Sequence, residues 1–164
     1  MTRDVPSPRL AVTWLPAPAA DSDAVMRLVA AFAGGPAGEL RIVRACRSCG
    51  SDRHGKPQIV MPAGAAPLHL SLSRSGDLAV VAVTDAGPVG IDLEAIRPDT
   101  EDLTAWVRTE SLVKATGHGL TIDPADITDI RWTSGLDAPD GYVAAVTVLS
   151  HVRPRITSRE APGA

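Results

Sequence analysis

Short apolar segments separated by turn residues recur along this chain, and they limit what it can fold into. Each is six to eight residues long and is typical of a β-strand, and most are rich in Val, Leu, Ile and Ala. These segments are residues 10–15, 40–45, 68–73, 78–83, 89–94, 127–133 and 142–149. The turn around Asp85–Pro88 predicts that 78–83 and 89–94 form a hairpin, whereas the polar residues 46–57 predict a loop.

Two other segments have helical signals. Residues 21–23 offer candidate N-caps for a helix that runs through Phe32. A second helix is expected over Thr100–Thr116, with Thr100 as its N-cap and Gly117 at its C-terminal end. Strands with one helix in each half of the chain indicate an α+β fold.

The chain is long enough for one domain, and its core must be aliphatic. It has 164 residues but only three Trp, one Tyr and one Phe. Proteins that recognise nucleic-acid bases by stacking need more aromatic side chains than this. The net charge of −3 gives no general attraction to nucleic acid or to an anionic membrane. We therefore expect neither as a partner.

The sequence predicts a cytoplasmic protein. No apolar run reaches the roughly 18 residues that a membrane-spanning helix needs, and the N-terminal residues lack the apolar core of a signal peptide. The two cysteines, Cys46 and Cys49, would stay reduced in that compartment. The tail, residues 153–164, contains Pro and Arg and is expected to fray.

Two carboxylates share one face of the segment Val89–Glu94. Because side chains alternate along a strand, Asp92 and Glu94 point the same way as Gly90, whose missing side chain leaves room beside them. Both acids could then reach one hard cation. An ordinary solvent-facing strand of an edge hairpin explains the same pattern equally well.

The second helix adds two charged residues to an apolar stripe. Leu103, Trp106 and Val107 define the stripe, and Glu110 and Lys114 continue it. Such a pair is often only a surface ion pair, but on the packing face it indicates a cleft. Three carboxylates and one lysine suit Mg²⁺ bound to phosphates, whereas zinc would prefer His or Cys.

The polar loop raises two further possibilities. Cys46, Cys49 and His54 could bind zinc, but a structural site needs four ligands, so a loop packed by two small thiols is the favoured interpretation. Lys56 and the serine-rich end of the segment 68–75 could hold phosphate oxygens. Ordinary solvation of these polar groups is the alternative.

Four motifs in order resemble a known family. They are HGKP at 54–57, LSLSRSG at 70–76, VGIDLE at 89–94 and WVRTESLVKATGHGL at 106–120. Together they resemble the 4′-phosphopantetheinyl transferase superfamily, in its Sfp-like branch, over roughly residues 40–149. The resemblance implies a fold of two similar lobes, each a small antiparallel sheet with a packed helix, at about residues 1–88 and 89–152. It also implies an enzyme that uses Mg²⁺ to move the phosphopantetheine arm of coenzyme A onto a serine of an acyl or peptidyl carrier protein.

The resemblance also assigns roles to individual residues. It implies that Asp92, Glu94 and Glu110 bind the metal. Glu110 would also take the serine proton, and Lys114 would assist the leaving phosphate. By the same resemblance Lys56 and Ser73 contact the coenzyme, and Arg74 stands where many members have His and is expected to bind a coenzyme phosphate.

The chain is shorter than the two-lobed members of this family usually are. Only sixteen positions separate Glu94 from Glu110, where the family places a helix and a long loop. A second hypothesis is therefore a transferase-like fold that binds coenzyme A or a carrier protein as a scaffold, or that serves another reaction of specialised metabolism. Trimmed lobes also predict exposed apolar surface and self-association into a homo-oligomer.

Overall fold

The protein has an α+β fold, as the sequence predicts. The computed structural model describes residues 7–35, 37–46, 49–99 and 102–160, and within them it contains two α-helices and three β-sheets. The helices are α1 (Ser22–Ala33) and α2 (Thr104–Thr116). The strands are β1 (Arg9–Pro16), β2 (Arg41–Ala45), β3 (Lys56–Val60), β4 (His69–Ser75), β5 (Leu78–Thr84), β6 (Val89–Ala95), β7 (Trp132–Leu136), β8 (Tyr142–Val148) and β9 (Arg155–Glu160). No helix in the described ranges is long and apolar enough to cross a membrane.

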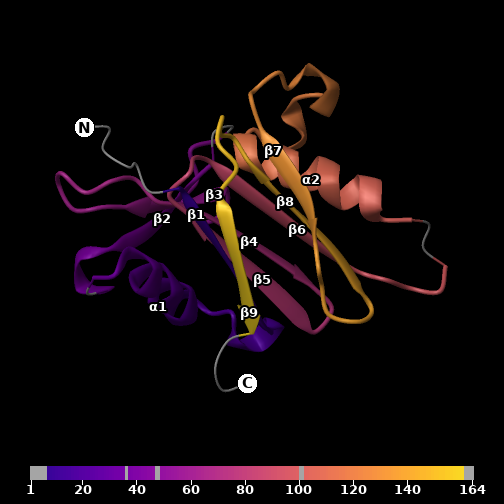
Figure 1. Ribbon diagram of the computed structural model, residues 1–164, viewed down its shortest axis with the longest axis horizontal. Helices are drawn as coiled ribbons and strands as arrows, with labels where there is room; N and C mark the ends of the chain where they lie inside the picture. The colour runs from indigo at the N-terminus through magenta and orange to yellow at the C-terminus, as the bar shows by residue number, and fades with distance from the viewer. Residues whose placement is uncertain (1–6, 36, 47–48, 100–101, 161–164) are drawn as a thin grey trace.

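Two sheets pack face to face and form the centre of the molecule (Figure 1). One has the strand order β4-β5-β1-β9 and the other the order β6-β8-β7, while β2 and β3 form a separate hairpin. Aliphatic side chains of β1, β5, β6 and β8 fill the space between the two sheets. Helix α1 covers the outer face of the four-stranded sheet, and α2 covers the outer face of the three-stranded sheet. Apart from Trp14, the buried residues of this core are aliphatic, as expected.

Helix α1 follows its sequence signals closely. The Asp21 carboxylate accepts a hydrogen bond from the backbone N–H of Ala24 at 2.7 Å and so caps the helix. The chain leaves the helix at Gly34, in the left-handed conformation. Val25 and Val29 are buried against the four-stranded sheet.

Helix α2 begins later than expected and turns a different face to the sheet. It starts at Thr104, whose backbone N–H donates to Asp102 at 2.9 Å; the predicted N-cap, Thr100, lies outside the described residues. The predicted apolar stripe is wrong at Trp106, which is 50% exposed. The prediction is right at Val107, which is buried, and Ser111 is buried too, where the helix backbone lies against Gly90 of β6.

The predicted hairpin of residues 78–83 and 89–94 is wrong. These segments are β5 and β6, but β5 pairs with β4 and β1, whereas β6 pairs with β8 in the other sheet. The Pro88 carbonyl accepts a hydrogen bond from the Leu149 backbone N–H at 2.8 Å, so the chain between the strands already belongs to the second sheet. Sequence proximity favours a hairpin, but the turn passes the chain from one sheet to the other.

The C-terminal segment is ordered where fraying was expected. Residues Arg155–Glu160 form β9, which pairs in parallel with β1. The indole N–H of Trp14 donates to the Ser158 hydroxyl at 2.9 Å, and Ile156 packs against the central core. The prediction for the tail failed because β9 is mostly exposed, and its pairing depends on an open edge of β1 that the local sequence does not reveal. Residues 161–164 lie outside the described ranges.

Three serines of β4 join the two sheets. The Ser71, Ser73 and Ser75 hydroxyls accept hydrogen bonds from backbone N–H groups of β6, at 3.0, 3.2 and 3.0 Å. The donors are Ile91, Leu93 and Ala95. Side-chain oxygens thus satisfy the open edge of β6, where another strand would otherwise be needed. This seam fixes β4 against the strand that carries the paired acids.

Replacing Ser71 with alanine should destabilise the fold without touching the acids. The substitution leaves the Ile91 N–H buried and without its acceptor, which costs about 1–3 kcal/mol. Urea denaturation measures the free energy of unfolding, and Ser7→Ala, at an exposed position before β1, is the matched control. Equal urea midpoints for the two variants would show that the hydrogen bond from Ile91 to Ser71 does not stabilise the fold.

Candidate active site

Helix α2 lies directly on β6 because Gly90 has no side chain. A Cβ built at Gly90 would lie 2.0 Å from the Ser111 carbonyl oxygen and 2.3 Å from the Ala115 backbone nitrogen. On the same helix face, the Ser111 and Thr147 hydroxyls lie 2.8 Å apart in a hydrogen bond between α2 and β8. The room that Gly90 leaves beside the two acids is therefore filled by the helix.

Asp92 is the most buried charged group of the site. Its side chain receives a hydrogen bond from the Lys114 ammonium at 2.5 Å and from the Ser73 hydroxyl at 3.2 Å, both on Oδ1. Lys114 also donates to Ser73 at 3.1 Å. Among the described residues nothing hydrogen-bonds the buried Oδ2 of Asp92. A buried carboxylate oxygen without a donor is costly, so it is a position where a cation would be stabilised.

Glu94 and Glu110 complete a group of three acids around this pair. The Ser75 hydroxyl donates to the Glu94 carboxylate at 3.1 Å. Glu94 lies two residues beyond Asp92, on the same face of β6. Burial raises the pKa of Glu110, and the charges of Asp92 and Glu94 raise it further, while Lys114 opposes them. Burial likewise raises the pKa of Asp92, against the lowering effect of Lys114. The charge of Glu94 therefore acts on both Asp92 and Glu110, and the charge of Asp92 acts on Glu110.

The donor set fits a hard divalent cation in its chemistry. Carboxylate oxygens are the ligands that Mg²⁺ prefers, and the Oδ2 of Asp92 has no hydrogen-bond donor among the described residues. Among the described residues, however, the ligand atoms that lie within 4.8 Å of one another are those of Cys46, Cys49 and His54, and the three acids do not form such a group. The magnesium set accordingly stays a prediction.

Neutralising Glu110 should leave the fold as stable or slightly more stable. Glu110→Gln removes the repulsion from Asp92 and Glu94, a gain of at most about 0.5 kcal/mol because water screens this partly exposed group. Because the folded pKa of Glu110 is raised, the wild-type gains stability as pH falls through the window between the folded and unfolded pKa values. The variant should lose that contribution, which thermal unfolding across mildly acidic pH measures. Glu39→Gln, at an exposed acid before β2, is the control, and a strongly destabilised Glu110→Gln would contradict this placement.

Lys56 and Lys114 line the same pocket. The pocket has a volume of about 380 Å³ and lies between the β2–β3 hairpin, β4 and the C-terminal end of α2. Ser71 and His118 also contribute to its wall. The Lys56 ammonium donates to the Ala115 carbonyl at 2.5 Å, so this lysine ties the hairpin to the helix. Lys114 therefore shares this pocket wall with Lys56 and also contacts Asp92.

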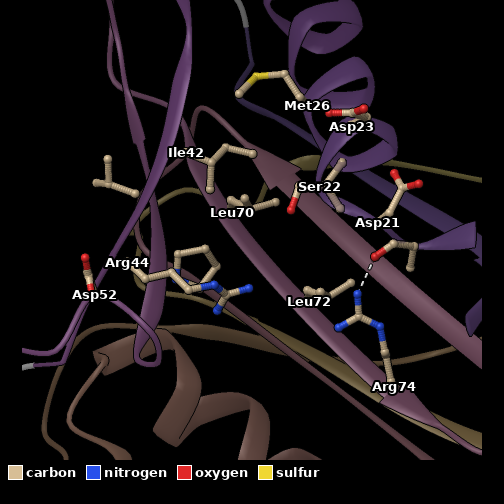
Figure 2. Close-up of a pocket in the computed structure, with 14 residues that line it drawn as sticks. Asp21, Ser22, Asp23, Met26, Ile42, Arg44, Asp52, Leu70, Leu72 and Arg74 are labelled. Atoms are coloured by element: carbon tan, nitrogen blue, oxygen red, sulfur yellow. Dashed lines mark hydrogen bonds between the residues drawn. The ribbon is translucent and has the colours of Figure 1, made fainter. Parts of the chain in front are cut away.

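Arg74 lies on the opposite face of β4 from Ser73. Its guanidinium donates to the Ala20 carbonyl and lines a second pocket, of about 510 Å³, between α1, β2 and β4 (Figure 2). Arg44 and Asp21 line the same pocket. The two pockets adjoin, because Arg44, Pro57 and Leu72 contribute to the walls of both. Arg74 is therefore not in the acid cluster but across the strand from it.

Ser73 and Ser75 hold different acids, a difference that the sequence does not reveal. Ser73, expected at the coenzyme, contacts Asp92 and Lys114, and Ser75 holds Glu94. The period-two spacing of the serines in β4 is the signal, since it places Ser71, Ser73 and Ser75 on one face. What that face would meet could not be known without the position of β6.

The chain is similar to a curated transferase. It is 30% identical over 126 residues to a protein of Bacillus subtilis described as 4′-phosphopantetheinyl transferase, and the match covers 58% of this chain. The chain spans about half of that relative, 54% of its length. No protein-family model matches. The family resemblance seen in the motifs is confirmed at the level of a distant relative.

Proposed function

Because the chain is a distant relative of the 4′-phosphopantetheinyl transferases, we propose that it moves the phosphopantetheine arm of coenzyme A onto a carrier-protein serine. The serine oxygen bonds to the phosphorus that bears the pantetheine arm, and the bond from that phosphorus to the bridging pyrophosphate oxygen breaks. Adenosine 3′,5′-bisphosphate leaves. The expected acceptor is an acyl or peptidyl carrier protein of specialised metabolism.

The observation that carries this proposal is the contact network of Asp92. A lysine and a serine converge on one oxygen of this buried acid, while the other oxygen has no donor among the described residues. Two more acids, Glu94 and Glu110, raise the electrostatic cost of the cluster. Such a cluster is expensive for stability and is typical of functional sites.

Each side chain has a role in this reaction. Glu110, which is partly exposed on α2, takes the proton of the attacking serine, and its raised pKa suits a general base. Lys114 offsets negative charge on the departing oxygen. Lys56 binds the 3′-phosphate of the coenzyme from the pocket wall. A magnesium ion held by Asp92, Glu94 and Glu110 would neutralise the pyrophosphate charge.

The decisive experiment offers coenzyme A, Mg²⁺ and a panel of apo-carrier proteins to the chain. Transfer adds the mass of the phosphopantetheine arm to a carrier, which intact-mass spectrometry detects directly. A characterised transferase serves as the positive control for each carrier. Absence of a mass gain on every carrier that the control modifies would refute the proposal.

Binding without transfer would support the second hypothesis. Calorimetry with coenzyme A, in the presence and absence of Mg²⁺, separates the two readings. Binding of coenzyme with no mass gain on a carrier indicates a coenzyme-binding protein on a transferase-like fold. Six large apolar side chains are exposed among the described residues, so self-association stays a prediction for sedimentation to test.

Arg74 provides a separate test of how the coenzyme lies. The coenzyme A phosphates are expected to extend from the Lys56 pocket past Arg44 into the adjoining pocket. Arg74→Ala should then weaken coenzyme A binding by about 1.5–3 kcal/mol, the range for a hydrogen bond to a charged group. Calorimetric titrations with coenzyme A and dephospho-coenzyme A show whether the 3′-phosphate is the group recognised. Arg27→Ala, on α1, is the control. Equal affinities in Arg74→Ala and the wild-type would leave Arg74 as a tie between β4 and Ala20.

A further inference from the structure

We propose that Cys46, Cys49 and His54 bind a zinc ion in the connection between β2 and β3. Their ligand atoms, two thiol sulfurs and an imidazole nitrogen, all lie within 4.8 Å of one another. The site lies outside the acid cluster and contains none of the residues assigned to transfer. Its test is therefore independent of the proposed transferase activity.

The backbone of the hairpin brings the three side chains together. Ala45 and Lys56 are paired in register, so the connection between them begins and ends at one place. At its far end Gly55 has a φ of 103°, and a Cβ there would lie 2.6 Å from the Ala45 carbonyl oxygen. Only glycine permits this close return, which carries His54 back beside Cys46.

Hydrogen bonds inside the connection place the two cysteines side by side. The Cys46 N–H donates to the Ser51 carbonyl at 2.9 Å, and the Gly50 N–H donates to the Cys46 carbonyl at 2.8 Å. These two bonds hold Cys46 close to Gly50 and Ser51. The Arg44 guanidinium donates to the Gly55 carbonyl at 3.0 Å and fastens the other side.

The donor chemistry favours zinc. The sulfur of Cys49 lies 3.3 Å from Nε2 of His54. Zinc at 2.3 Å from sulfur and about 2.0–2.1 Å from nitrogen would place these atoms roughly 3.6 Å apart in a tetrahedral site, so a small adjustment suffices. Thiolate and imidazole ligands select zinc over Mg²⁺.

Other uses of these residues fit less well. The interpretation of two packed thiols is wrong for Cys49, which is exposed. A disulfide would use the cysteines alone and would give no reason for His54 to approach them. Three protein ligands leave a fourth position for water or a small molecule, as in zinc sites that are not purely structural. Cys46 and His54 line the same pocket as Lys56 and Lys114, so such a molecule could enter from there.

Metal titration of the full chain tests the proposal. The reduced, chelator-treated protein should take up one zinc ion per chain, measured by elemental analysis after desalting, and zinc should raise its melting temperature. Cobalt in place of zinc should give a thiolate-to-metal charge-transfer band and the intense visible bands of a tetrahedral site. Cys49→Ser and His54→Ala should each weaken zinc binding by at least about 100-fold, beyond the effect of losing an outer-shell partner.

Matched controls keep the result interpretable. Cys49 and His54 are exposed, so neither substitution opens the core, and circular dichroism verifies the fold. His118→Ala, which changes an exposed histidine of the same pocket, should bind zinc like the wild-type. The proposal is overturned if the wild-type takes up no zinc, if Cys49→Ser binds it equally well, or if the thiols remain a disulfide under reducing conditions. None of these readouts uses coenzyme A or a carrier protein.

Discussion

Replacing Asp92 with asparagine is expected to lower the transfer rate by about 10²–10³-fold or more, the scale of losing a central electrostatic contact. The change removes one charge from the proposed metal ligands and the anionic partner of Lys114. Asparagine has nearly the same shape, so the side chain still fits between β6 and Ser73. Intact-mass kinetics on a modified carrier measures the rate.

A second readout separates lost metal binding from lost structure. If Asp92 holds Mg²⁺, the ion should raise the melting temperature of the wild-type by mass action and should leave that of Asp92→Asn unchanged. Asp137→Asn, at an exposed acid between β7 and β8, should behave as the wild-type in both assays. An unaltered transfer rate in Asp92→Asn would show that the acids of β6 are not the reacting centre.

Replacing Gly90 with alanine should cause the largest loss of stability. The added Cβ would lie 2.0 Å from the Ser111 carbonyl oxygen and 2.3 Å from the Ala115 nitrogen. Both are backbone atoms of α2, so the helix itself must move. We expect a loss of about 3 kcal/mol or more in the free energy of unfolding, at the upper end for overpacked cores. That corresponds to a fall of roughly 6–12 °C in the melting temperature.

The control for this variant is Gly35→Ala. A Cβ at Gly35 would meet no atom within 4 Å, so its substitution tests glycine replacement without the clash. Thermal and urea unfolding of both variants measure the difference. If Gly90→Ala were as stable as Gly35→Ala, the close contact of α2 with β6 would be incorrect. A shifted helix would also move Lys114 away from Asp92, so the proposed activity should fall even in the folded fraction.

The two variants address one physical relation. The site depends on two carboxylates of β6 lying under a helix that carries a third acid and a lysine. Gly90 sets the distance between these elements, and Asp92 uses it. Residues two positions apart on one strand face thus have opposite properties: one has no side chain so that the helix can approach, and the other has a charge that this approach buries.

Local patterns determined most of the strands and the site candidates. Period-two alternation placed Asp92 and Glu94 on one face and the β4 serines on another, because strand geometry alone fixes which side chains share a face. Capping signals determined α1, since Asp21 satisfies the first turn with its own carboxylate. The family motifs determined the distant kinship that the Bacillus subtilis relative bears out.

Pairing between distant segments was decided only by the tertiary structure. The sequence near residue 85 favours a hairpin, yet β5 and β6 enter different sheets because β6 finds its partner in β8. The tail looked unstructured, yet β9 lies along β1, because an exposed strand is held by backbone hydrogen bonds and leaves almost no apolar signal. For Arg74, strand alternation predicts that it faces away from Ser73, but only the tertiary structure shows that Ser73 meets Asp92 while Arg74 meets Ala20. Sequence fixes what each face presents, and only the packing of distant elements decides what that face touches.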